Sequence, residues 1–179
     1  MDSPARYCLS CGTALADVSV QEDGGWKARR RCPACGWTHW NNPTPVLAAI
    51  VECVDRDGRI LLARNAAWQH RMFALITGFM EAGETPEAGI AREVLEETAL
   101  TVEQVTLVAV HDFQRMNQVI ITYHVQARGE VRLSPELAEY KLYAPQDVRC
   151  WRAGTGLALA QWLQGRGYTP QFIELPPRP

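Results

Sequence analysis

Apolar residues follow two periods along this chain, and the period distinguishes the expected strands from the expected helices. Residues 46–54 form a nearly unbroken apolar run, which is typical of a strand buried on both faces. The Asp-Arg-Asp-Gly sequence at 55–58 predicts a hairpin turn into a second strand at 59–63. Alternating or β-branched stretches predict further strands at 105–113 and 119–127 and a short one at 142–144.

Two segments place apolar residues at the i, i+3, i+4 and i+7 positions of a helix. The first covers residues 85–98, with Thr85 as the N-cap and Pro86 at the first helical position. The second, residues 156–165, predicts an amphipathic helix near the end of the sequence. Strands interrupted by these helices predict an α/β fold in which a mixed β-sheet lies between α-helices.

The first 42 residues predict a separate, small β module. An Asp-Gly-Gly sequence at 23–25 predicts a hairpin turn within it. The sequence Asn-Asn-Pro-Thr-Pro at 41–45 is incompatible with a helix and marks a boundary. We therefore expect a module at 1–42, a larger domain at 43–168 and a loose C-terminal tail at 169–179.

Four of the six cysteines form two Cys-x2-Cys pairs that are separated by 20 residues: Cys8, Cys11, Cys32 and Cys35. Two such knuckles predict a structural Zn²⁺ site, because four thiolates leave no open coordination position. Two disulfides are the alternative, but they need an oxidising compartment. No signal peptide precedes the first pair, so we expect a cytoplasmic protein. Cys53 and Cys150 stand alone in apolar contexts and are expected to be buried free thiols.

Composition predicts a globular protein with one substantial core, since 47% of the 179 residues are hydrophobic. The net charge is −2 and no apolar run could span a bilayer, so we expect no membrane partner. Arginines at 29–31 and Trp26, Trp37 and Trp40 together could favour single-stranded nucleic acid. However, residues 1–45 contain five Lys and Arg against four Asp and Glu. This weak electrostatic footprint favours arginines at a solvated strand edge and argues against a nucleic-acid partner.

The predicted helix at 85–98 carries three closely spaced acids. Glu93 and Glu97 are four residues apart and lie on one face, with Glu96 beside them. Clustered carboxylates repel one another unless a cation lies between them, and their hard oxygen ligands suit Mg²⁺ or Mn²⁺. The alternative is a solvated polar face of an amphipathic helix, in which Arg92 and Glu96 form an ordinary i, i+4 pair.

The segment around these acids resembles the Nudix hydrolase family. Its signature is G-x5-E-x7-R-E-U-x-E-E-x-G-U, where U is an aliphatic residue. Eight of the nine specified positions match over 23 residues: Gly78, Glu84, Arg92, Glu93, Val94, Glu96, Glu97 and Leu100. The departure is Ala99 in place of the last glycine, just past the predicted helix end, where a left-handed residue is common. Because Ala99 replaces no metal ligand, we expect it to affect local geometry more than chemistry.

The resemblance implies the Nudix fold, preceded here by the small zinc-ribbon module. It also implies hydrolysis of a nucleoside diphosphate linked to another moiety, by attack of water at phosphorus. In that chemistry Glu93 and Glu97 would bind Mg²⁺ or Mn²⁺, with Glu96 as a ligand or a base. The carbonyl of Thr77 would be a further ligand, and Arg92 would orient Glu84 or a neighbouring acid.

The family often takes a further glutamate from outside the motif, and Glu136 and Glu139 are the candidates. We prefer Glu136 as a metal ligand, although an exposed turn explains both acids nearly as well. Phe113, Tyr123 and Trp68 could stack on a base of the substrate, or could simply pack in the core.

A zinc ribbon before a Nudix domain resembles the pyrophosphatases that cleave NADH, FAD or similar dinucleotides. The NADH branch carries a Ser-Gln-Pro-Trp-Pro-Phe-Pro signature, and this chain has His-Asp-Phe-Gln-Arg-Met-Asn-Gln at 111–118 instead. NADH, FAD and ADP-ribose therefore all stay open as substrates. A capped-RNA enzyme and a non-catalytic nucleotide sensor are the alternatives, but sensors usually lose motif acids that are all present here. The ribbon could also form a homodimer contact.

Overall fold

The computed structural model describes residues 5–174. The chain forms two compact units that divide after Pro43, and the short segment Arg115–Asn117 belongs with the first unit. No helix within the described range is both long and apolar enough to cross a membrane.

The first unit contains a three-stranded antiparallel sheet in the order β1-β2-β3. Its strands are β1 (Ala16–Glu22), β2 (Gly25–Arg31) and β3 (Thr38–His39). The expected turn at 23–25 connects β1 to β2, and Glu22 pairs with Gly25 in the strand register.

The expectation of a solvated strand edge at 29–31 is wrong, because β2 is the central strand of this sheet. Arg29 donates from Nε to Glu22 Oε1 at 2.7 Å, and Arg30 donates from Nε to Asp17 Oδ1 at 3.1 Å. Glu22 and Asp17, both on β1, therefore compensate the charges of Arg29 and Arg30. The sequence alone does not reveal these pairs.

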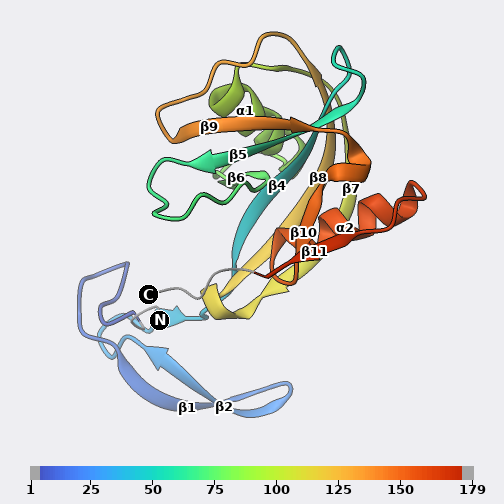
Figure 1. The fold of residues 1–179 in the computed structure, drawn as a ribbon. Coiled ribbons are helices and arrows are strands. Elements are labelled where there is room, and N and C mark those ends of the chain that lie inside the picture. Colours follow the sequence, from blue (N-terminus) through green and yellow to red (C-terminus); the bar gives the residue numbers. More distant parts are fainter. Residues whose placement is uncertain (1–4, 175–179) are drawn as a thin grey trace. The chain divides into compact units, whose positions relative to one another are not determined.

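The second unit is built on a six-stranded mixed sheet (Figure 1). The hydrogen-bonded order is β7-β8-β4-β5-β9, and β6 also pairs with β4. The β4–β8 pair is parallel, whereas β6 runs antiparallel to β4. The strands are β4 (Thr44–Cys53), β5 (Arg59–Asn65), β6 (Ile76–Phe79), β7 (Thr101–Phe113), β8 (Gln118–Arg128) and β9 (Leu137–Tyr143).

Helices cover the two faces of this sheet. The helix α1 (Pro86–Thr98) contributes Ile90 and Val94 to one core, and α2 (Thr155–Gly165) contributes Leu159 and Leu163 to the other. The short elements are the 3-10 turns η1 (Gln114–Met116) and η2 (Pro145–Asp147), and the strands β10 (Arg149–Trp151) and β11 (Gln171–Ile173). A mixed sheet between helices confirms the predicted α/β fold class.

The central strand β4 is buried on both faces, as its apolar run predicts. Leu47 and Val51 belong to the core beneath α1, whereas Ile50 belongs to the core beneath α2. Cys53 and Cys150 are free thiols with no exposed surface. Burial raises the pKa of each to about 11, which leaves both thiols protonated and unreactive near neutral pH.

Two segments differ from the expectation. The last core strand, β9, is longer than the predicted 142–144. The prediction is too short because exposed polar residues interrupt the apolar pattern of this edge strand. The expected tail also contains a strand: Gln171–Ile173 pair in parallel with Arg149–Trp151. Residues 175–179 lie outside the described range.

The helix α1 ends in a left-handed residue, as the motif predicts. Ala99 has φ 58° and ψ 13°, and its N–H donates to the carbonyl of Leu95 at 2.8 Å. The Cβ of alanine clashes with its own backbone in this conformation, whereas glycine adopts it freely.

We therefore expect Ala99→Gly to raise the free energy of unfolding by about 1 kcal/mol. Urea denaturation would measure this change. The matched control is Ala88→Gly, at an exposed position in the first turn of α1, which should lower stability by up to about 1 kcal/mol. A loss of stability in Ala99→Gly would contradict the strain argument.

Candidate active site

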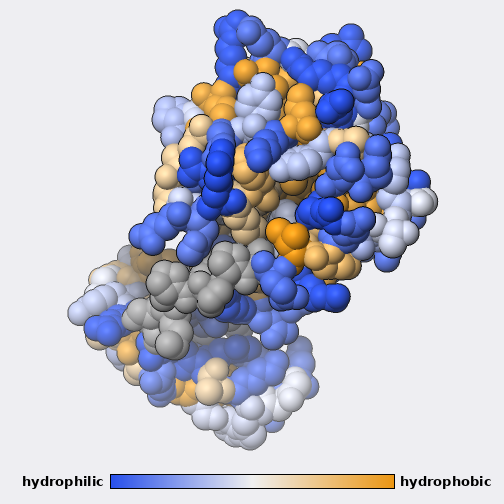
Figure 2. Space-filling model, in the orientation of Figure 1, coloured by the Kyte–Doolittle hydropathy of each residue, from blue (hydrophilic) through white to orange (hydrophobic). Residues whose placement is uncertain are grey.

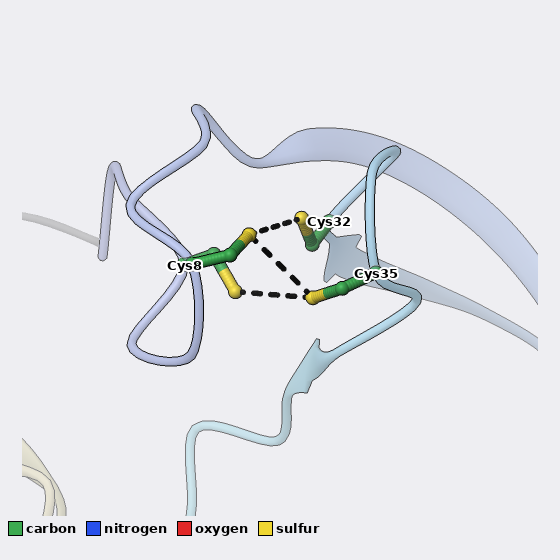
Figure 3. Close-up of side chains that lie close together, drawn as sticks. Cys8, Cys32 and Cys35 are labelled. Carbon is green, nitrogen blue, oxygen red and sulfur yellow. Dashed lines mark hydrogen bonds between the residues drawn. The ribbon is translucent and has the colours of Figure 1, made fainter.

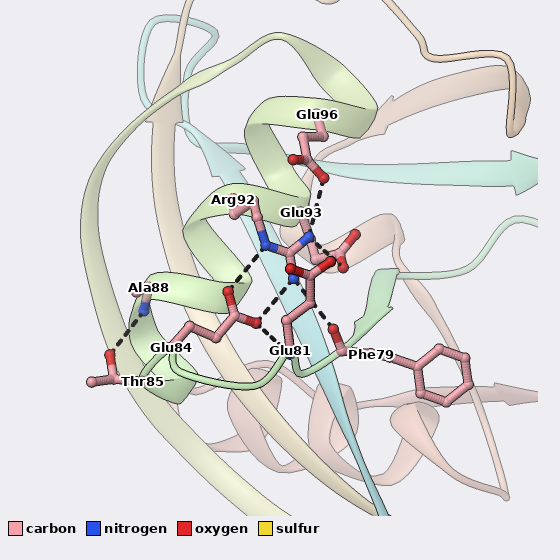
Figure 4. Close-up of polar contacts among 8 residues, drawn as sticks. All are labelled: Phe79, Glu81, Glu84, Thr85, Ala88, Arg92, Glu93 and Glu96. Atoms are coloured by element: carbon pink, nitrogen blue, oxygen red, sulfur yellow. Dashed lines mark hydrogen bonds and ion pairs between the residues drawn. The ribbon is translucent and has the colours of Figure 1, made fainter.

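The acidic helix α1 is positioned by its own N-terminal cap and by the turn that precedes it. Thr85 accepts a hydrogen bond from the N–H of Ala88 at 3.2 Å, and Pro86 begins the helix. Gly83, with φ 88°, turns the chain from β6 into this cap. The turn places Glu84 beside Arg92, two helical turns into α1 (Figure 4).

The guanidinium of Arg92 lies at the centre of the cluster. It donates from Nε and Nη2 to the two carboxylate oxygens of Glu84, each at 3.0 Å. Its Nη1 donates to Glu93 at 2.9 Å and to Glu96 at 3.1 Å. Its Nη2 also donates to the carbonyl of Phe79 at 3.3 Å. The arrangement holds the turn, the end of β6 and the acidic face of α1 together.

Glu84 is a buried structural anion more than a free catalytic group. Its side chain is 15% exposed, and the bidentate contact with Arg92 lowers its pKa. Its Oε1 also accepts a hydrogen bond from the N–H of Glu81 at 2.7 Å. Glu84 therefore fixes the turn from both sides while it orients Arg92.

Two glycines, Gly78 and Gly89, allow this close packing. The Nudix motif specifies Gly78 but not Gly89. A Cβ on Gly78 would overlap the carboxylate of Glu93, so the backbone of β6 lies directly against that acid. A Cβ on Gly89 would lie 2.5 Å from Glu84 Oε1 and 2.6 Å from the Leu47 side chain. The sequence signal for Gly89 is its place inside a strong helical pattern. A glycine there lowers helix stability, so its presence indicates that close packing leaves no room for a side chain.

Four carboxylates lie within electrostatic reach of one another: Glu93, Glu96, Glu97 and Glu136. Burial is the largest cause that raises the pKa of Glu97 to about 7, followed by the charges of Glu93, Glu136 and Glu96. Burial also raises the pKa of Glu93. The fold thus brings Glu136, which is 39 residues from Glu97 in the sequence, into electrostatic contact with the motif acids.

Glu139, the other candidate from that segment, is engaged elsewhere. It accepts a hydrogen bond from Arg64 at 2.7 Å and one from Arg71 at 3.0 Å. These contacts lower the pKa of Glu139 to about 2. A carboxylate with two arginine partners is a poor metal ligand, so the structure favours Glu136 over Glu139.

The carboxylates lie near one another without converging on one point. Within residues 5–174, only the four cysteines place three or more ligand atoms within 4.8 Å of one another. Mg²⁺ fits such an open set, because it needs only one or two carboxylates and keeps several waters. Thr77 precedes Gly78 on β6, so its carbonyl lies one peptide unit from the backbone that contacts Glu93.

The four cysteines form a compact cluster in the first unit (Figure 3). Sulfur–sulfur distances of 3.5 and 3.6 Å are far too long for disulfides, and all four thiols are free. They match the edge of a ZnS4 tetrahedron with Zn–S bonds of about 2.3 Å.

The two knuckles that carry these cysteines share one backbone conformation. The N–H of Gly12 donates to the Cys8 carbonyl at 2.9 Å, and the N–H of Gly36 donates to the Cys32 carbonyl at 3.0 Å. Both glycines have positive φ, 72° and 78°. The cluster is therefore consistent with the predicted zinc ribbon.

Comparison with known proteins agrees with this geometry. A family model described as the NUDIX domain matches residues 43–164, which is more than half of the chain. The chain belongs to the Nudix family. The family assignment suggested by the motif is confirmed.

Two curated relatives of this Nudix chain are NAD-capped RNA hydrolases named NudC. The protein from Mycobacterium tuberculosis (strain H37Ra) is 34% identical over 176 residues, covering 90% of this chain and 54% of the relative. The protein from Pseudomonas putida (strain F1) is 27% identical over 155 residues, covering 86% of this chain and 53% of the relative. The chain thus spans about half the length of the curated relatives it matches.

A solved structure extends the comparison to the fold. The crystal structure of a Nudix hydrolase from Nitrosomonas europaea superposes with a TM-score of 0.73 at 25% identity. The match covers 96% of this chain and 100% of the other, so the likeness includes the cysteine-bearing unit as well as the Nudix domain.

The aromatic residues expected near a substrate base are distributed unevenly in this Nudix chain. Tyr123 is only 3% exposed, and its hydroxyl donates to Glu87 at 3.0 Å, so the ring packs in the core and has no free face for a base. Phe113 is half-buried, and Trp68 is 42% exposed in the loop between β5 and β6. Phe79, which the motif leaves unspecified, is 59% exposed, and its carbonyl accepts a hydrogen bond from Arg92.

Gly89 provides a test of the packing around Glu84. Helix propensity alone predicts that Gly89→Ala stabilises α1 by about 1 kcal/mol. We expect the opposite, a loss of about 1–3 kcal/mol, because Leu47 is fully buried and Glu84 is held by Arg92. Thermal unfolding would measure both effects.

The matched control for this test is Gly165→Ala at the end of α2. A Cβ there meets no atom within 4 Å, so this substitution should be neutral or slightly stabilising. Equal changes in stability for Gly89→Ala and Gly165→Ala would contradict the argument that the space beside Glu84 is too small for a side chain.

Proposed function

We propose that this protein hydrolyses a phosphoanhydride bond in a nucleoside diphosphate linked to another moiety, by attack of water at phosphorus. The observation that supports the proposal is the complete acidic set: Arg92 holds Glu84, Glu93 and Glu96, and Glu97 and Glu136 lie within electrostatic reach of Glu93. A sensor would not need to keep four mutually repelling carboxylates, since each lowers the stability of the fold in the absence of a cation.

The proposed catalytic cofactor is Mg²⁺ or Mn²⁺. Glu93, Glu97, Glu136 and the carbonyl of Thr77 would hold it, because Glu93 lies against Gly78 and interacts electrostatically with Glu97 and Glu136. When bound, a divalent ion neutralises phosphate charge and lowers the pKa of coordinated water.

The protein's own residues then have distinct proposed roles. Arg92 holds Glu93 in place through a 2.9 Å hydrogen bond and keeps the turn at Glu84 closed. Glu96 is 58% exposed, which leaves it free to act as an outer ligand or as the base that takes a proton from water. Glu97 is protonated in part near neutral pH without a cation and would lose that proton when metal binds.

For the substrate we favour a dinucleotide such as NADH, FAD or ADP-ribose. Phe79 follows Gly78 directly, is 59% exposed and directs its ring away from Arg92 (Figure 4), so it could stack on one base of such a molecule. NAD-capped RNA is the second candidate, because the relatives are named for that substrate. Such an RNA carries the dinucleotide NAD at its end. Exposed Trp26 and Trp40 on the first unit could stack on RNA bases, with Arg29 already 5.4 Å from the Trp40 ring.

Zn²⁺ is the proposed structural cofactor of the first unit, held by Cys8, Cys11, Cys32 and Cys35. Among the described residues of this unit only Cys8 and Cys32 are buried, so the metal would replace a hydrophobic core.

The reaction can be tested by product analysis with NADH, NAD⁺, FAD, ADP-ribose, nucleoside triphosphates and NAD-capped RNA in Mg²⁺ or Mn²⁺. We expect cleavage of dinucleotides to mononucleotides, and a fall in kcat of about 10²–10⁴-fold for Glu97→Gln. The matched control is Glu87→Gln, which removes an acid of α1 that bonds Tyr123 and should keep most activity.

The variants also separate the substrates. Phe79→Ala should raise KM for dinucleotides by about tenfold with little change in kcat, since stacking on a base contributes about 1–3 kcal/mol. Faster turnover of NAD-capped RNA than of free NAD⁺ would favour the second candidate. No turnover of any of these compounds by the unmodified protein would contradict the proposed reaction.

The zinc proposal predicts one Zn²⁺ per chain by elemental analysis of protein purified without added metal. Cys32→Ser should remove the metal and unfold the first unit, because a buried ligand is lost. Cys53→Ser, at a buried thiol outside the cluster, is the control and should retain full metal content. A metal-free protein with an intact first unit would exclude this role.

A further inference from the structure

A pocket opens on the face of the sheet that carries α2, away from the acidic helix. It has a volume of about 300 Å³ and lies between the β5–β6 loop, the end of β9 and β10. Leu62 in its floor belongs to the core beneath α2, whereas its neighbours Leu61 and Ala63 point to the core beneath α1. The sheet therefore separates this pocket from Glu93 and Glu97.

The floor of the pocket is apolar and partly aromatic. Leu62, Phe73 and Tyr143 form it, and the two rings are half-buried. On the molecular face that includes β9, β10 and β11, hydrophobic residues are exposed between hydrophilic ones (Figure 2). A volume of this size is at the lower end of the range for small-molecule sites, which suits a ligand with one ring system.

The rim of the pocket is cationic. His70, Arg71 and Arg149 line it, and no aspartate or glutamate does. Arg149 is exposed and forms no ion pair with the described part of the chain. Lys141 adds a further positive charge, with its Nζ 4.6 Å from the centre of the Phe73 ring.

One carboxylate offsets part of this charge. Glu139 accepts hydrogen bonds from both Arg64 and Arg71, so a single acid is shared by two arginines. Arg149 and Lys141 form no ion pair with residues 5–174, so this part of the chain gives the pocket a net positive rim above an aromatic floor. This combination excludes a divalent cation as the ligand and favours an anion that carries a flat ring.

We propose that this pocket binds a small aromatic phosphate, of the size of a nucleoside monophosphate. The phosphate would lie against the guanidinium of Arg149, which can donate two parallel hydrogen bonds to it, and the ring would lie on Tyr143 and the Phe73 edge. Binding needs no divalent metal, because the site contains no carboxylate for one. The proposal is thus independent of the proposed hydrolysis at the acidic helix.

Isothermal titration calorimetry with AMP in the presence of EDTA tests the proposal, because chelation removes any metal-dependent binding at the acids. We expect saturable binding that Arg149→Gln weakens by about tenfold or more. The matched control is Arg152→Gln, a cation close in the sequence that lies over Phe172 and does not line the pocket. It should leave the dissociation constant within about twofold.

Two further variants locate the binding. Glu97→Gln and Phe79→Ala alter the acidic site and should each leave metal-free AMP binding unchanged. Adenosine and inorganic phosphate alone should each bind about tenfold more weakly than AMP, because each makes only half of the contacts.

Three results would overturn the proposal: no AMP binding in EDTA, equal weakening by Arg149→Gln and Arg152→Gln, or loss of binding in Phe79→Ala. Phosphate that binds as tightly as AMP would also overturn it, since the aromatic floor would then contribute nothing. Circular dichroism of Arg149→Gln should match that of the unmodified protein, and Arg149→Lys should restore part of the affinity through the retained charge.

Discussion

One guanidinium holds the acidic region of the Nudix domain together. Arg92 is 24% exposed and contacts three carboxylates and a backbone carbonyl, and its pKa is raised mainly by Glu84. Without it, Glu84 would be a buried unpaired charge, and Glu93 would face Glu96 and Glu97 with no compensating cation. The turn after β6, the start of α1 and the spacing of the acids all depend on this residue.

The same helix has to satisfy two demands that conflict. Its inner face supplies Ile90 and Val94 to a closely packed core, while Glu97, only 8% exposed, is drawn into the same environment. Glycines at 78 and 89 relieve the crowding, since each stands where a side chain would strike a carboxylate. The acids can therefore be close to the backbone of β6 without displacing the sheet.

Much of this arrangement could be predicted from local sequence. The N-cap at Thr85, the helix at 86–98 and the left-handed Ala99 each follow from a short-range rule, and the structure has all three. The cysteine cluster follows from spacing in the same way. A nearly unbroken apolar run also identifies β4, because a strand that is buried on both faces carries such a run.

What sequence could not predict depends on pairing across long distances. Glu136 and Glu139 look alike in sequence, and only the position of Arg64 and Arg71 separates them. The sequence places the arginines of β2 at an edge, because no local signal reveals that the two-residue strand β3 pairs with Arg30 and Arg31. Tyr123 and Phe79 are both aromatic, but tertiary packing buries one and exposes the other. The strand β9 was shortened because an edge strand lacks the apolar run of a central one.

Burial of Glu97 among three other acids has an evolutionary consequence. A neutral residue at that position would remove both a desolvated charge and its repulsion, so a protein with glutamine there should be more thermally robust than the unmodified one. Selection for heat resistance alone would discard this acid first, and its retention in a sequence would then record selection for something other than stability.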